Sequence, residues 1–159
     1  MSDSTRTANG ARGNASAEKV LKKMAVVMVD IMRTYKQFRH MNASYYILNN
    51  KTVFFKSYNT EVLYIDATTE YPYISFLEYT GVTTQKQITT FLRSNLLDSI
   101  TNGEHIEKPY KAALKWARDK GYRGKRISLT AYPWYMVVSV VGSNEMYRVS
   151  YDGKTLKKI

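Results

Sequence analysis

Short runs made mostly of β-branched and aromatic residues, separated by turn residues, fill the middle and the end of the chain, and such runs are typical of β-strands. The runs are rich in Tyr, Phe, Val and Ile, and they cover residues 44–48, 52–58, 61–66, 71–79, 127–132, 134–141 and 145–151. Asn49 and Asn50 separate the first two runs and predict a tight hairpin, because Asn tolerates positive φ angles. Asn59 lies between the second and third runs and is compatible either with a bulge in one bent strand or with a reversal between two strands.

Three other segments repeat apolar residues every three or four positions, which predicts amphipathic helices. The first begins at Ser16 and carries its apolar pattern as far as Phe38. The second runs to about Leu97. At its start, Thr84 and Gln87 have the T-x-x-Q spacing of a capping box, in which each side chain satisfies a backbone N–H group.

The third helix is expected from about Ile106 to Lys120, and Gly121 follows it as the residue type favoured just beyond a helix C-terminus. At about 100° per residue, one side of this helix is apolar and the opposite side is basic. The apolar side holds Tyr110, Ala113, Leu114 and Ala117, and the basic side holds Lys108, Lys111, Lys115 and Arg118. This is the clearest basic stripe in the sequence.

Because strands and helices both recur, the sequence predicts an α+β domain, built as an antiparallel β-sheet with about three helices packed on it. Residues 16–159 are expected to form this single domain. Residues 1–15 contain hardly any apolar side chain larger than Ala and are expected to be a disordered tail.

The amino-acid composition limits the cellular compartment and the kinds of binding partner that we expect for this chain. The chain has no cysteine, which excludes disulfides and thiolate metal sites. Its first residues lack the apolar core of a signal peptide, and the longest apolar run, 24–29, is far below the roughly 20 residues that span a bilayer. We therefore expect a soluble cytoplasmic protein without membrane contact. A net charge of +11 would attract polyanions or acidic protein surfaces.

Motifs that carry enzyme chemistry are missing from the sequence. It contains no phosphate-binding loop, no dinucleotide fingerprint, no H-E-x-x-H and no G-x-S-x-G. Its two histidines, His40 and His105, are far apart along the chain. Asp98, Glu104 and Glu107 cluster near one loop, where helix capping and surface ion pairs explain them better than acid–base catalysis. The sequence thus predicts a protein that is not an enzyme and has no catalytic residues, metal or cofactor.

Aromatic residues beside prolines are the best candidates for a protein interface, because Tyr and Trp bury a large area with few rotatable bonds. Pro72 and Pro133 cannot donate sheet hydrogen bonds, so we expect them and their neighbours at sheet edges. With the basic stripe of the third helix, the predicted partner-binding residues are Tyr71, Tyr73, Trp134, Tyr135, Lys108, Lys111, Lys115 and Arg118. Tyr71-Pro72-Tyr73 and Tyr132-Pro133-Trp134 look alike but do not make a repeat.

A resemblance sharpens the functional expectation. About a third of the chain resembles a small domain of phages that infect Gram-positive bacteria, in which S-Y-x-T on a strand precedes Y-S-x-T-T-x-K-x-x-x-x-F. The matching residues here are Ser57-Tyr58-Asn59-Thr60 and Tyr79-Thr80-Gly81-Val82-Thr83-Thr84, with Phe91. Thr80 stands where the pattern has Ser, and Lys86 is displaced by one position relative to the basic residue of the pattern. In size, lack of cysteine and basic third helix, the chain also resembles anti-CRISPR proteins of staphylococcal mobile elements.

That resemblance implies an inhibitor without catalytic activity, in the cytoplasm of a bacterial host. Its partner would be a type II CRISPR effector nuclease with its guide RNA, and secondary contact with nucleic acid is possible. Holding a nuclease domain in an inactive conformation would block DNA cleavage. The alternative is a basic phage protein that binds nucleic acid, through Lys108, Lys111, Lys115, Arg118, Arg123, Lys125 and Arg126. A third possibility is a metal-dependent nuclease.

Overall fold

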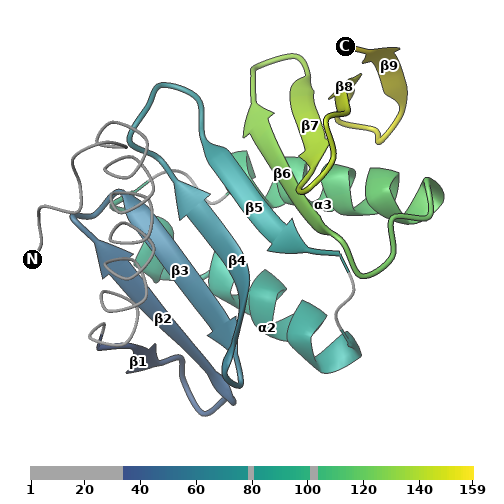
Figure 1. Cartoon of the computed structure of the whole chain (residues 1–159). Coiled ribbons are helices and arrows are strands. Elements are labelled where there is room, and N and C mark those ends of the chain that lie inside the picture. Colours follow the sequence, from purple (N-terminus) through teal and green to yellow (C-terminus); the bar gives the residue numbers. More distant parts are fainter. Residues whose placement is uncertain (1–33, 79–80, 101–103) are drawn as a thin grey trace, which may run out of the picture. The chain divides into compact units, whose positions relative to one another are not determined.

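The computed structural model describes residues 34–78, 81–100 and 104–159. Residues Tyr35–Ile159 form one compact unit, an antiparallel sheet in which every strand pairs with the next strand along the chain (Figure 1). The strands are β1 (Lys36–Gln37), β2 (Ala43–Leu48), β3 (Thr52–Ser57), β4 (Thr60–Asp66), β5 (Tyr73–Leu77), β6 (Arg126–Ala131), β7 (Met136–Val140), β8 (Met146–Val149) and β9 (Thr155–Lys158). The α+β class with an antiparallel sheet is confirmed.

Between β5 and β6 the chain leaves the sheet to form α2 (Val82–Leu92), the 3-10 helix η2 (Asn95–Leu97) and α3 (Glu104–Asp119). Both α-helices lie on the same face of the sheet (Figure 1). Phe55 of β3 and Phe76 of β5 both pair with Leu63 of β4, so they point to one face. The Phe55 ring is 4.4 Å from that of Phe91 on α2, and the Phe76 ring is 5.0 Å from that of Tyr110 on α3.

The core lies between this face and the two helices. Along β3, Val53, Phe55 and Ser57 are buried while Phe54 and Lys56 on the other face are partly exposed, which is the period-two alternation of a strand. The apolar side predicted for α3 is buried as expected. Trp116, which the sequence did not single out, is also almost fully buried there.

A polar network inside this core overturns the predicted capping box. α2 begins at Val82 with Gly81 as its N-cap, and no side chain caps it. Thr84 and Gln87 instead bond to Ser57 at the end of β3. The Ser57 hydroxyl lies 2.8 Å from Thr84 Oγ1 and donates to Gln87 Oε1 at 2.7 Å. Ser57, Thr84 and Gln87 therefore link the end of β3 to the first turns of α2. Ser57 and Thr84 belong to the motif that resembles the phage domain, and Gln87 follows it three residues later.

The hairpin turns follow the sequence in part. Asn49 and Asn50 have φ angles of 52° and 55°, which confirms the tight hairpin between β2 and β3. The alternatives left open at Asn59 resolve as a reversal between β3 and β4, accompanied by a register shift between Phe55 and Lys56. In this turn Tyr58 has the positive φ angle, at 56°. The left-handed conformation is sterically less favourable for Tyr than for Asn.

Three expectations about elements need correction. The described part of the chain holds two α-helices rather than three; most of the first predicted helix, from Ser16, lies outside the described residues. Its predicted end is wrong, because Lys36–Gln37 is a strand and Phe38 packs edge-on against Phe91 at 5.3 Å. The last basic segment forms β9, which the sequence did not predict. The boundary at residue 16 stays a prediction, because it also lies outside the described residues.

The predicted sheet edges are wrong as well. Pro72 precedes β5 and Pro133 lies between β6 and β7, and all three of these strands are interior to the sheet. Pro72 is tolerated because it stands just outside the strand, where its carbonyl oxygen accepts a hydrogen bond from the Ala131 N–H at 2.9 Å. The prolines therefore mark the ends of strands and not the lateral edges of the sheet.

Replacing Ser57 with Ala tests the buried network. Gln87 would keep a buried carbonyl oxygen without its donor, which is expected to lower the free energy of unfolding by about 1–3 kcal/mol. Thr90→Ala is the matched control, because the Thr90 hydroxyl bonds to the Lys86 carbonyl on the exposed side of α2 and its loss is expected to cost at most about 0.5 kcal/mol. Equal losses in urea denaturation would contradict a structural role for the network.

Gly153 tests how closely the β8–β9 turn approaches α3. Its φ angle is +87°, and an added Cβ would lie 3.1 Å from Lys115 Cδ. Gly153→Ala is expected to destabilise the protein by about 2–3 kcal/mol, through backbone strain and a crowded contact. Gly142 has a φ angle of +92° with nothing within 4 Å of the added Cβ, so Gly142→Ala isolates the strain, at about 1–2 kcal/mol. If Gly142→Ala lowers the thermal midpoint more than Gly153→Ala does, the close approach of the β8–β9 turn to α3 is refuted.

Candidate partner-binding site

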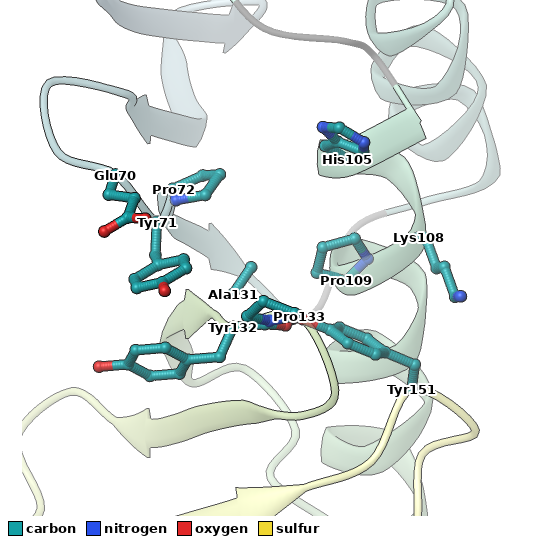
Figure 2. Close-up of a pocket in the computed structure, with 10 residues that line it drawn as sticks. All are labelled: Glu70, Tyr71, Pro72, His105, Lys108, Pro109, Ala131, Tyr132, Pro133 and Tyr151. Carbon is teal, nitrogen blue, oxygen red and sulfur yellow. Dashed lines mark hydrogen bonds between the residues drawn. The ribbon is translucent and has the colours of Figure 1, made fainter.

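A pocket of about 410 Å³ lies where β5 begins, β6 ends and α3 starts. Its walls are formed by Glu70, Tyr71, Pro72, His105, Lys108, Pro109, Ala131, Tyr132, Pro133 and Tyr151 (Figure 2). The two similar segments of the sequence meet here, because β5 and β6 are antiparallel neighbours with Tyr73 paired to Thr130. Extending that register beyond the strands brings Tyr71 beside Tyr132.

Three tyrosine rings form an aromatic cluster at the pocket. The ring of Tyr132 lies 5.0 Å from that of Tyr71 and 5.4 Å from that of Tyr135. The guanidinium of Arg148 covers the ring of Tyr135 at 4.7 Å. Between Pro133 and Tyr135, at the turn between β6 and β7, Trp134 leaves 84% of its surface exposed. Packing therefore fixes the three tyrosine rings of the aromatic cluster, whereas the neighbouring Trp134 is open to solvent.

Tyr151 holds the turn that carries these rings. Its hydroxyl donates to the carbonyl oxygens of Tyr132 and Tyr135, so one side chain ties the residues on both sides of Pro133 and Trp134 to the segment between β8 and β9. Burial raises the pKa of Tyr151 to about 12. The Lys108 ammonium lies 5.4 Å from the centre of the same ring.

The basic stripe is exposed on α3 as predicted, but most of its charges are paired. Lys111 lies 2.8 Å from Glu107, Lys115 lies 2.8 Å from Asp119, and Arg118 lies 3.6 Å from Glu78. Within the described residues, no carboxylate is at ion-pair distance from Lys108. Of the four stripe residues, Lys108 is thus the one without a carboxylate at ion-pair distance in the described part of the chain, and it is also the one that lines the pocket.

Glu107 is the electrostatic centre of the contact between α2 and α3. Its carboxylate accepts hydrogen bonds from Arg93 Nε at 2.9 Å and from Arg93 Nη2 at 2.7 Å, and Lys111 is its second cation. The hydrogen bond from Arg93 is the main cause that lowers the pKa of Glu107 to about 2, and Lys111 adds to it. The expectation of surface ion pairs is confirmed for Glu107.

The predicted partner-binding residues divide into two groups. The structure brings Tyr71 and Lys108 into one pocket, with Tyr135 and Trp134 beside it. The others lie elsewhere: Tyr73 is on β5 with its ring 6.1 Å from that of Tyr64, and Lys111, Lys115 and Arg118 continue along α3. Sequence reasoning missed Tyr132, Tyr151, His105 and Pro109. The similarity of the two Tyr-Pro-aromatic segments was the signal that could have identified Tyr132.

Nowhere in 34–78, 81–100 and 104–159 do three or more His, Asp or Glu side chains gather as they would around a metal ion. No helix in these ranges is long and apolar enough to cross a membrane. No family model matches the chain, and neither a curated protein nor a solved structure matches it.

The residues that line the pocket combine apolar rings with polar and charged groups. Pro72 and Pro133 supply rigid apolar rings beside the buried Pro109, and Tyr71 and Tyr132 supply flat faces that end in hydroxyls. Glu70 is exposed on one wall, and His105 and Lys108 are exposed on α3 (Figure 2). Apolar rings combined with a few polar groups are typical of sites that bind peptides and small molecules.

Glu107→Gln should change how stability depends on pH. The folded-state pKa of Glu107 is below its ordinary value of 4.5, so its ion pairs stabilise the fold above pH 4.5, and this stabilisation is lost as the pH falls through about 2. The variant is expected to be less stable than the wild type at pH 7 and to lose less stability between pH 5 and pH 2. Denaturant melts at several pH values measure this. Parallel pH profiles for the two proteins would contradict the assigned pKa shift.

Proposed function

We propose that this chain is a binding protein that inhibits a type II CRISPR effector nuclease, loaded with its guide RNA, by protein–protein contact in the cytoplasm of a bacterial host. The identity of the partner comes from the sequence resemblance. The observation that supports the binding role is the exposed Trp134 between Pro133 and the aromatic cluster. An indole that contributes little to the fold, held on a fixed turn, suits the centre of an interface.

Rigidity of the site favours binding. Association costs about 0.5–1.5 kcal/mol for each mobile side chain that becomes ordered. Packing of Tyr71, Tyr132 and Tyr135 on one another, together with the Tyr151 hydrogen bonds, removes much of this cost before the partner arrives. The aromatic cluster with Trp134 can therefore supply affinity, while the net positive charge attracts an acidic patch on the partner.

Inhibition adds one thermodynamic condition. A ligand shifts a conformational equilibrium only by the difference between its affinities for the two states. To block cleavage, the chain must therefore bind the inactive arrangement of the nuclease domain more tightly than the active one. To change the ratio of the two states from 1:99 to 99:1, this preference has to be about 10⁴-fold.

A cleavage assay with purified effector and guide RNA tests the proposal. Excess chain is expected to form a stoichiometric complex and to stop cleavage, and Trp134→Ala is expected to raise the half-inhibitory concentration at least tenfold, about 1.4 kcal/mol. Val82 is the matched control, because it is 82% exposed on α2 and Val82→Ala should change inhibition less than twofold. Full cleavage in the presence of excess wild-type chain would rule out the proposal.

Nucleic-acid binding is the alternative proposal, and its support is the run of basic residues that continues from α3 into the loop before β6, including Lys125. Ion pairs already occupy Lys111, Lys115 and Arg118, and Arg126 bonds to Glu61 at 2.7 Å, which leaves fewer cations for phosphates. Oligonucleotide binding that weakens steeply with added salt would favour this alternative. Turnover of DNA by the chain alone with a divalent metal would favour a nuclease.

A further inference from the structure

We propose that the pocket binds an extended, proline-containing peptide segment in the polyproline II conformation. This inference rests on the proposed function, because it names the kind of segment that the protein partner would present. It assigns a ligand class to the pocket.

The shape and composition of the walls carry the first step. Tyr71, Pro72, Tyr132 and Pro133 lie side by side from two neighbouring strand ends, and Pro109 faces them from α3 (Figure 2). Surfaces built from aromatic rings are the ones on which polyproline II helices dock, since proline rings pack flat against them. At about 410 Å³ the pocket falls within the range of typical small binding sites, which suits a few residues of an extended segment.

Hydrogen-bond donors around the pocket carry the second step. Within the described part of the chain, the hydroxyls of Tyr71, Tyr132 and Tyr135 and the indole N–H of Trp134 donate to no protein group. A polyproline II segment makes no internal hydrogen bonds, so its carbonyl oxygens are free to accept. Donors at the ends of aromatic rings and free acceptors along the ligand are complementary.

Charge argues for a peptide rather than for single-stranded nucleic acid. Glu70 shares the lining with Lys108 and His105, so a phosphate backbone would meet a carboxylate as well as a cation. A peptide with a basic residue near Glu70 and an acidic residue near Lys108 satisfies both charges.

Low conformational entropy on both sides favours the complex. Tyr151 fixes the turn that carries Pro133 and Trp134, and prolines in the ligand fix its φ angles before binding. Little ordering is then required on association, so even a short segment can bind specifically.

The test uses the full chain and acetylated peptides of the form Arg-Pro-Pro-Leu-Pro-Pro-Glu and its reversed sequence. A peptide of the same length and charge with every proline replaced by alanine is the control ligand. Calorimetry gives the affinity, and the emission shift of Trp134 locates the binding, since the second tryptophan, Trp116, is buried. At least one proline peptide is expected to bind at least tenfold more tightly than the alanine peptide.

Variants of the chain locate the site. Trp134→Ala, at a position too exposed to matter for folding, and Tyr132→Ala are each expected to weaken peptide binding at least tenfold. Tyr58→Ala is the matched control, because Tyr58 is 61% exposed in the turn between β3 and β4, away from the pocket, and it should bind within twofold of wild type. Equal loss in Tyr58→Ala would overturn the assignment of the site.

Three outcomes would overturn this inference. They are the absence of binding at millimolar peptide, equal affinity for the proline and alanine peptides, and displacement of bound peptide by an oligothymidylate. The proposed function is tested separately. If the effector complex forms and is weakened by Trp134→Ala while no proline peptide binds, the ligand class alone is wrong; if the peptides bind and the effector does not, the proposed function is wrong.

Discussion

The pairing of β5 with β6 is the constraint on which the rest of the structure depends. These strands are joined through both α-helices, yet they lie side by side with Tyr73 opposite Thr130 and Phe76 opposite Ile127. The helices therefore have to return the chain to the strand it left, and they do so by covering the face that carries Phe55 and Phe76. The same pairing places the two Tyr-Pro-aromatic segments beside each other. The pocket is thus a consequence of the strand register.

Several contacts fasten the C-terminal strands to α3 and so support the other side of the pocket. Trp116 on α3 donates to the Thr155 hydroxyl at 2.8 Å. The Tyr147 hydroxyl donates to Glu145 Oε2 at 2.7 Å, and it is hydrogen-bonded to the Tyr122 hydroxyl at 3.2 Å. The hydrogen bonds to Tyr122 and Glu145 raise the pKa of Tyr147. Because Tyr151 lies between β8 and β9, its hold on the pocket turn depends on this network.

Local patterns in the sequence predicted much of the fold and less of the site. Runs rich in Tyr, Phe, Val and Ile between turn residues located the strands from β2 to β8, and Gly121 marked the end of α3 with a φ angle of 79°. The T-x-x-Q spacing misled, because a capping box is local, whereas Thr84 and Gln87 bond to Ser57 across the core. The exposed strand β9 has the sequence Thr-Leu-Lys-Lys, which contains no run of β-branched and aromatic residues to reveal it. Tyr151 reaches the pocket through tertiary contacts that its neighbours in sequence do not indicate.

Charge and aromatic surface play different parts in this protein. A net charge of +11 suggests that electrostatics dominates binding, but Lys111, Lys115 and Arg118 already face carboxylates. Exposed ion pairs of this kind contribute little to stability, and they also limit the charge available to a partner. What remains is a long-range field that speeds encounter with acidic surfaces. In the proposed complex, Trp134 and the aromatic cluster would set the lifetime, because truncating a buried aromatic anchor acts mainly on the dissociation rate.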